Sequence, residues 1–402
     1  MFDPSRVQVS GPLKGYAPGF VAELAGQGYT PLSATLQLRL VARLSAWLVS
    51  EDLQVSELTQ PVCERFTAAR RAGGSRNLVT VKALAPLLGY LDDVGVSRPG
   101  PDPVLEPVEV LLQEYGRYLT RQRGLARSTA EVYVRMVRPF LTEHYGPDGS
   151  GLAGLSGAHI IEFVLASAPG RAVASAKLMV TALRSVLEFL HVQGLIRMPL
   201  AEAVPSVAGW RLAPLPKGLE PEAVLRLVGG CDRRSRIGRR DYAILLMLVR
   251  LGLRSGEVAS LTLEDINWRA GELLVRGKGN HAERLPLPVD VGEGIEAYLR
   301  RGRPATAQGR LVFVRHRAPH RRLTTAGVGN IVGRASQRAG LGHVFAHQLR
   351  HTAATAMVRA GAPLSEVGQV LGHARPMTTA IYAKVDRDAL RTLALPWPGR
   401  PA

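Results

Sequence analysis

Residues 347–382 read HQLRHTAATAMVRAGAPLSEVGQVLGHARPMTTAIY. Apolar residues recur here at spacings of three and four, and a glycine follows each run, which predicts two helices over 347–360 and 364–371. His347 and Arg350 are three positions apart, so they share one face at the start of the first helix. Polar groups on short apolar helices are costly to bury, so these side chains are expected to serve a chemical role.

The segment upstream begins with a strongly apolar run. DYAILLMLVRLG at 241–252 predicts a buried helix, and GLRSGEVASL follows it. Ser255 and Glu257 are typical of a new helix start directly after Arg254. Taken alone, such an arginine is a capping or ion-pair residue.

A β-hairpin is expected next. The short segments 272–275 and 284–287 are rich in apolar and β-favouring residues, and they flank RGKGNHAE, which places Lys278 at the tip. We expect 311–314 to add a third strand and 324–339 to form a helix.

Two proline-rich stretches, 98–107 and 205–221, interrupt the chain. Prolines at this density stop helices and stiffen linkers. They predict three domains, over 1–97, 108–204 and 218–402.

The first two blocks resemble one another and read as helical bundles. GLARSTAEVYVRMVRPFL at 124–141 aligns with GYTPLSATLQLRLVARLS at 28–45, and LRSVLEFLHVQGL at 183–195 aligns with LAPLLGYLDDVGV at 84–96. Any two amphipathic helices align to some extent, but the order of the matches is also preserved. We therefore interpret block 1–97 as a duplicate of block 108–204.

The charge of the chain points to a partner class. The net charge is +18, carried mostly by arginine, whose planar guanidinium matches phosphate oxygens. No apolar run approaches the ~20 residues of a membrane span, and the amino terminus lacks an apolar signal core. Two cysteines cannot build a disulfide framework. These features favour a nucleic-acid partner, no membrane, and a reducing cytoplasm.

The polar residues that stand out in the third block are Arg254, Lys278, His347, Arg350, His373 and Tyr382. No carboxylate cluster and no Gly-rich phosphate loop accompanies them, so we expect no metal and no cofactor. The set suits attack on a phosphodiester. Arginines can bind the nonbridging oxygens, lysine or histidine can transfer protons, and tyrosine can hold the phosphorus covalently.

The block resembles the tyrosine recombinases, the lambda-integrase family. GLRSGEVASLTLEDINW is similar to the first arginine box, and 347–382 is similar to the H-x-x-R, L-G-H and tyrosine boxes in order. The resemblance covers about 218–390, and 108–204 resembles the helical core-binding domain. It implies a mainly α fold with a small antiparallel β-sheet, in which helical SAM-like DNA-binding domains precede a mixed α+β catalytic domain.

The resemblance implies a role for each residue of the set. Arg254 and Arg350 would bind the scissile phosphate, and Lys278 would protonate the leaving 5′ oxygen. Tyr382 would be the nucleophile that forms a 3′-phosphotyrosine.

The histidines and one acidic residue have supporting roles in this interpretation. His347 would assist proton transfer, His373 would hydrogen-bond the phosphate, and Glu257 would order the arginine pocket. We interpret His351 as structural and His281 as a solvated loop residue.

The resulting hypothesis is a site-specific DNA integrase or transposase of a mobile element. It would act on double-stranded DNA as a homo-tetramer on paired sites, with accessory DNA-bending proteins as further partners, in the cytoplasm at the nucleoid. The apolar stretch 390–395 would dock on a neighbouring protomer. The alternatives are a Xer-type resolvase of chromosome or plasmid dimers, a DNA-binding architectural protein that does not cut, and a type IB topoisomerase.

Overall fold

Each of the three blocks has a hydrophobic core of its own, and a smaller cluster in the last block includes Tyr382. The computed structural model describes residues 3–96, 105–146, 148–208, 218–277, 282–372, 379 and 381–382. One core lies within the first helical block, one within the second and the largest within the last block. The chain divides into two compact units, Pro99–Arg211 and the remainder, Met1–Arg98 with Leu212–Ala402.

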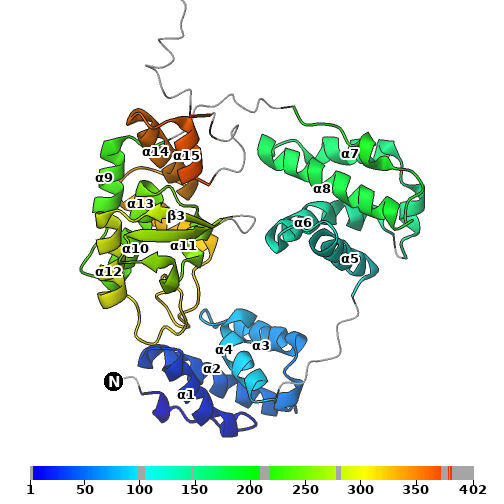
Figure 1. Cartoon of the computed structure of the whole chain (residues 1–402). Helices are drawn as coiled ribbons and strands as arrows, with labels where there is room; N and C mark the ends of the chain where they lie inside the picture. The colour runs from blue at the N-terminus through cyan, green and yellow to red at the C-terminus, as the bar shows by residue number, and fades with distance from the viewer. Residues whose placement is uncertain are drawn as a thin grey trace, which may run out of the picture. The chain divides into compact units, whose positions relative to one another are not determined.

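The first block is a four-helix bundle, drawn in blue to cyan in Figure 1. Thr30 caps the second helix by accepting a hydrogen bond from the Ser33 N–H (3.3 Å), and Pro31 occupies the first helical position. Buried leucine and phenylalanine side chains from all four helices form its core. The helices are α1 (Ala17–Gly26), α2 (Pro31–Ser50), α3 (Gln60–Ala72) and α4 (Val81–Asp93).

The second block is also a four-helix bundle. Its last helix contributes the most buried side chains, because ten of its twenty residues are buried. The helices are α5 (Pro107–Arg121), α6 (Arg127–His144), α7 (Gly157–Ser167) and α8 (Val173–Val192).

The turns of the two bundles have the same backbone conformation. Gly28 and Gly124 have φ of +81° and +61°, and each lies three residues before the second helix of its bundle. Gly95 and Gly194 both have φ of +72° and follow the fourth helix. In each bundle the residue after this last glycine donates its N–H to a carbonyl five residues earlier, at 2.9 Å. The fourth helices therefore end in the same hydrogen-bonded cap.

The interiors of the bundles also match. Phe20 and Tyr90 pack with ring centroids 5.7 Å apart at 44°, and Tyr115 and Phe189 pack at 5.4 Å and 46°, each pair joining the first helix to the fourth. The offset between matched positions rises from 95 to 99 along the chain. Further buried pairs are Ala34 and Ala130, Val41 and Val137, Leu44 and Phe140, Phe66 and Phe163, and Leu91 and Leu190.

The last block combines helices with a small sheet. Its central helix, α10 (Arg236–Arg250), packs against five of the others, α9, α11, α12, α13 and α14. The remaining helices are α9 (Pro221–Gly229), α11 (Ser255–Ser260), α12 (Val289–Arg301), α13 (Thr325–Arg338), α14 (Ala346–Arg359) and α15 (Leu364–Val370).

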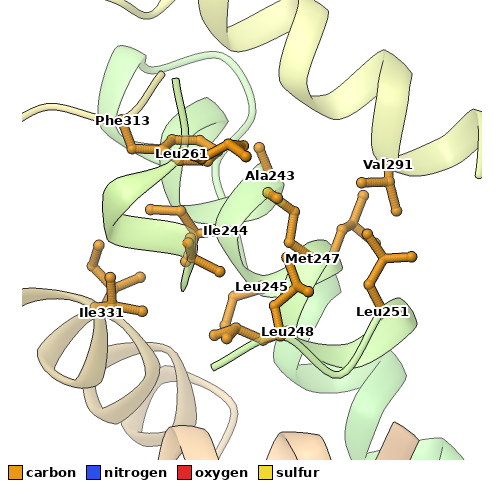
Figure 2. Close-up of a cluster of buried hydrophobic side chains, with 14 of the residues drawn as sticks. Ala243, Ile244, Leu245, Met247, Leu248, Leu251, Leu261, Val291, Phe313 and Ile331 are labelled. Carbon is orange, nitrogen blue, oxygen red and sulfur yellow. The ribbon is translucent and has the colours of Figure 1, made fainter. Parts of the chain in front are cut away.

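The expected helix over 241–252 is present but begins earlier. Ser235 caps α10 by accepting a hydrogen bond from the Gly238 N–H at 3.0 Å, so the helix starts at Arg236. Six consecutive residues from Ala243 to Leu248 are buried. Figure 2 shows side chains of this run, among them Ile244 and Met247, clustered with Leu261, Val291 and Phe313 from neighbouring segments. A helical segment that is apolar on all sides, as this run is, belongs at the centre of a core.

The expected hairpin is confirmed. Strands β2 (Glu272–Arg276) and β3 (Ala282–Pro286) pair antiparallel, with Leu273 opposite Leu285. These two leucines are buried on the core-facing side. The third strand is β1 (Ile266–Asn267), which pairs with β2 and completes the order β1-β2-β3.

The prediction of a strand over 311–314 is wrong. Leu311 and Val314 form only isolated bridges, to Thr262 and Arg322. Val312 and Phe313 are both fully buried although they are adjacent, so the segment lacks the alternation of a half-buried strand. Its apolar residues fill the core beneath α10 instead.

The later helices follow the sequence pattern closely. The expected helices over 324–339, 347–360 and 364–371 correspond to α13, α14 and α15, with ends that differ by one residue. Within the described residues, no helix has the length and hydropathy required to cross a bilayer.

Candidate active site

Arg254 lies at the junction of α10 and α11. Its backbone N–H donates to Glu257 Oε2 at 2.7 Å, and its Nη1 donates to Glu257 Oε1 at 2.6 Å. The Glu257 side chain is only 7% exposed, whereas that of Arg254 is 40% exposed. The carboxylate therefore caps α11 and fixes Nη1 of a guanidinium that remains partly exposed to solvent.

Arg350 is held by backbone carbonyls. It is 3% exposed, its Nη1 donates to the Gly252 oxygen at 2.7 Å, and its Nη2 donates to the Leu371 oxygen. Burial, together with nearby Arg254, lowers the pKa of Arg350 to about 10. The group stays charged at neutral pH, and its position is fixed before any ligand binds.

Gly252 permits this arrangement. It has φ of +63°, and a Cβ at this position would lie 2.7 Å from Leu371 Cδ2. A side chain would be strained by this φ and would displace the Leu371 side chain, which belongs to the residue whose carbonyl binds Arg350.

The two arginines line one pocket of about 450 Å³. His347 lines it as well, so three of the six residues singled out from the sequence converge there. Arg276, at the end of β2, lines the same pocket and forms an ion pair with the buried Asp265. Sequence reasoning missed Arg276, although its place directly after the predicted strand 272–275 and two residues before Lys278 was a usable signal.

His347 and His351 lie one turn apart on α14. Their ring centroids are 4.4 Å apart at 72°. Partial burial lowers the pKa of His347, and the charges of Arg350 and Arg254 lower it further. Burial, His347 and Arg350 lower the pKa of His351. Both imidazoles are therefore neutral at neutral pH and able to accept protons.

Tyr382 is buried beside α14. It is 1% exposed and packs among Ala354, Val358 and Leu371. Its hydroxyl lies 2.8 Å from His351 Nδ1. Burial raises the pKa of Tyr382, and the charge of Arg350 opposes that rise. The structure thus gives His351 a polar partner, which sequence reasoning did not identify.

Three residues of interest, Lys278, His281 and His373, lie outside the described residues, as does the tail segment 390–395. Their chain neighbours are described. Gly277 lines the pocket, and the Gly372 carbonyl accepts a hydrogen bond from Arg254 Nη2 at 3.3 Å. Gly277 thus shares a pocket with Arg254, and Gly372 contacts Arg254 directly.

The pocket suits an anion with several oxygens. Its charged lining residues are Arg254, Glu257, Arg276 and Arg350, and the neutral His347 lies among them. Two guanidinium groups held from behind can bind the nonbridging oxygens of a phosphodiester without rearranging. Across the described part of the chain, no group of three or more His, Cys, Asp or Glu residues is placed to hold a metal ion.

Two family descriptions match the chain. Residues 217–388 match "Phage integrase family", and residues 112–194 match "Phage integrase, N-terminal SAM-like domain". The first match contains the arginine pocket and Tyr382, and the second contains most of α5–α8.

Individual relatives extend the likeness to nearly the whole chain. A Sinorhizobium fredii protein named as integrase/recombinase y4rA is 42% identical over 97% of this chain and 95% of its own length. Tyrosine recombinase XerD of Mycobacterium tuberculosis is 33% identical over 73% of this chain and 98% of its own length. A lambda integrase tetramer bound to a Holliday junction shares the fold, with a TM-score of 0.54 and 16% identity over 81% of this chain and 90% of that chain.

Proposed function

The chain belongs to the phage integrase family of tyrosine recombinases, enzymes that cleave and rejoin DNA, and from this premise we propose how its own residues perform the reaction. Tyr382 attacks a phosphodiester of duplex DNA and forms a 3′-phosphotyrosine. The convergence of Arg254, His347 and Arg350 on one pocket is the observation that carries the proposal.

Arg254 and Arg350 bind the scissile phosphate. As the phosphorus becomes five-coordinate, negative charge grows on its nonbridging oxygens, and two preset guanidinium groups stabilise it. Glu257 orders Arg254 rather than contacting DNA, in keeping with its burial.

Proton transfer completes the step. Lys278 donates a proton to the leaving 5′ oxygen, His373 hydrogen-bonds the phosphate, and His347 assists proton transfer next to the arginines. The positions of Gly277 and Gly372 beside Arg254 support these assignments. Rejoining reverses the step, because a 5′ hydroxyl attacks the phosphotyrosine and displaces Tyr382. The phosphoester bond is conserved throughout, so the cycle requires no nucleotide hydrolysis.

The biological role is integration or transposition of a mobile element. It is supported by the relative that matches 97% of the chain, which is named as an integrase/recombinase, whereas the Xer-type relative covers 73%. Exchange between two duplexes needs four cleavages, so we expect a homo-tetramer on paired sites, aided by DNA-bending proteins. The enzyme would act on the DNA of the nucleoid in the cytoplasm.

Domains over 1–97, 108–204 and 218–402 belong to the same proposal. Block 108–204 is the SAM-like core-binding domain, and block 1–97 is its duplicate. The matched glycine turns, caps and aromatic pairs of the two bundles support duplication, because amphipathic helices alone do not reproduce them.

Trapping of the covalent intermediate tests the reaction. A suicide substrate, nicked so that the cleaved strand is lost, should give a protein–DNA adduct with the wild-type chain and none with Tyr382→Phe. Tyr242→Phe removes a hydroxyl from the same block and should form adduct normally, since the Tyr242 ring contacts Arg233 away from the pocket. If wild type forms no adduct on its element–chromosome junction, the proposed function is wrong.

A further inference from the structure

The hydrogen bond between Tyr382 and His351 has a defined direction. The phenol keeps its proton at neutral pH because burial raises the pKa of Tyr382. The imidazole is neutral because burial and neighbouring cations lower the pKa of His351. The Tyr382 hydroxyl therefore donates to His351 Nδ1 over 2.8 Å. This distance is normal for a hydroxyl donor with a nitrogen acceptor.

We propose that His351 is the general base for the nucleophile, which holds the Tyr382 hydroxyl at rest and takes its proton during cleavage. The inference rests on the proposed function and deepens it. In the step, the Tyr382 oxygen forms a bond to phosphorus, the bond from phosphorus to the 5′ oxygen breaks, and the phenolic proton moves to His351 Nδ1. The 5′ oxygen takes its proton from the general acid. During rejoining the His351 imidazolium returns the proton to the departing Tyr382 oxygen.

Geometry favours His351 over His347 for this role. His347 lines the arginine pocket, where the proposed reaction places the phosphate. His351 does not line that pocket, and its ring packs against the Tyr382 ring with centroids 5.6 Å apart. The two histidines therefore have different roles: His347 lies at the arginine pocket, and His351 lies against the tyrosine.

The electrostatics of the site make the transfer conditional on bound DNA. Without a phosphate, Arg350 and its neighbours disfavour a charged His351, so the proton stays on the phenol. A bound phosphodiester brings negative charge against Arg254 and Arg350 and partly neutralises them. Bond formation to phosphorus also makes the phenolic oxygen strongly acidic. The proton then moves to His351 at the moment of attack and not before.

Two substitutions distinguish the two roles of His351, which are to accept a hydrogen bond from the Tyr382 hydroxyl and to take its proton. In His351→Asn, the side-chain oxygen occupies the place of Nδ1 and can accept the hydroxyl bond but no proton at neutral pH. His351→Ala removes both functions. We expect single-turnover adduct formation to slow by about 100-fold or more in both variants, the lower end of general-base effects. His343→Asn makes the same change at an exposed histidine before α14 and should keep the wild-type rate. Gel shift and thermal unfolding would show that each variant folds and binds DNA.

A modified substrate identifies the side of the reaction on which His351 acts. A sulfur atom replacing the bridging 5′ oxygen leaves without protonation. It should restore cleavage to Lys278→Ala, whose defect lies in the leaving group, but should leave the His351→Asn defect unchanged. If sulfur restores His351→Asn to the wild-type rate, His351 serves the leaving group and the inference is wrong.

The remaining outcomes also decide the question. Wild-type rates in His351→Asn would show that the histidine only positions the tyrosine, which overturns the base assignment. Such a result would leave the proposed function intact, because wild type would still form the Tyr382 adduct. Failure of wild type to form adduct would instead remove the premise.

Discussion

Glu257→Gln is expected to slow DNA cleavage while leaving DNA affinity unchanged. The carboxylate accepts two bonds within the Arg254 residue, one from the backbone N–H at 2.7 Å and one from Nη1 at 2.6 Å. A glutamine of the same shape has only one side-chain oxygen. Whichever way the amide turns, one of the two donors loses its acceptor and faces an NH₂ group.

The size of the effect follows from these contacts. An unsatisfied buried donor costs about 1–3 kcal/mol, and a hydrogen bond to a charged group contributes about 1.5–3 kcal/mol. The Arg254 side chain is 40% exposed, so water replaces part of the loss and the lower values apply. If misplacement of Arg254 raises the activation free energy by about 2 kcal/mol, DNA cleavage becomes about 30-fold slower.

The assay is single-turnover adduct formation on a suicide substrate, with binding measured by gel shift. Glu264→Gln makes the same change at an exposed glutamate that pairs with Arg310 outside the pocket, and it should cleave at the wild-type rate. Normal cleavage by a folded Glu257→Gln variant would refute the reasoning, because the arginine would then hold its position without the carboxylate.

Three further predictions concern stability. Leu248→Ala should lower the free energy of unfolding by about 2–5 kcal/mol, because it leaves a cavity in the core beside α10, whereas the exposed Leu225→Ala should change it little; urea titration measures both. Gly95→Ala and Gly194→Ala should each lower the free energy of unfolding by about 1 kcal/mol, because both positions have φ of +72°. Thermal unfolding measures both, and unequal losses would count against equivalent helix caps. Because the pKa of folded His351 lies below its ordinary 6.5, the unfolded chain binds more protons, so unfolding free energy should fall as pH drops from 7 through 6.5, and less steeply in His351→Asn.

Much of the last block could be predicted because local signals and tertiary packing agree there. The hairpin over β2 and β3 follows from two short apolar segments around a glycine-bearing loop. The start of α11 follows from the spacing of Ser255 and Glu257, and the structure makes Glu257 the acceptor for the residue before the helix. Where a segment satisfies its own hydrogen bonds locally, its structure can be predicted from the sequence alone.

Features that depend on distant partners could not be predicted. Residues 311–314 have a β-favouring composition, but the adjacent side chains of Val312 and Phe313 are both fully buried in the core. The sequence alone favours a structural role for His351, which lies next to Arg350, whereas the structure places it against Tyr382, 31 positions away. Its spacing of four from His347 was a signal that both rings lie along one side of a helix.

The placement of three groups on α14 constrains how this protein can change over generations. His347, Arg350 and His351 are carried by one rigid helix packed against α10, so a core substitution that tilts the helix moves the phosphate ligand and the partner of the tyrosine together. Mutational effects around α14 should therefore depend strongly on one another. The evolutionary signature is epistasis: substitutions beneath this helix persist as compensating pairs, whereas surface positions of the two bundles drift independently.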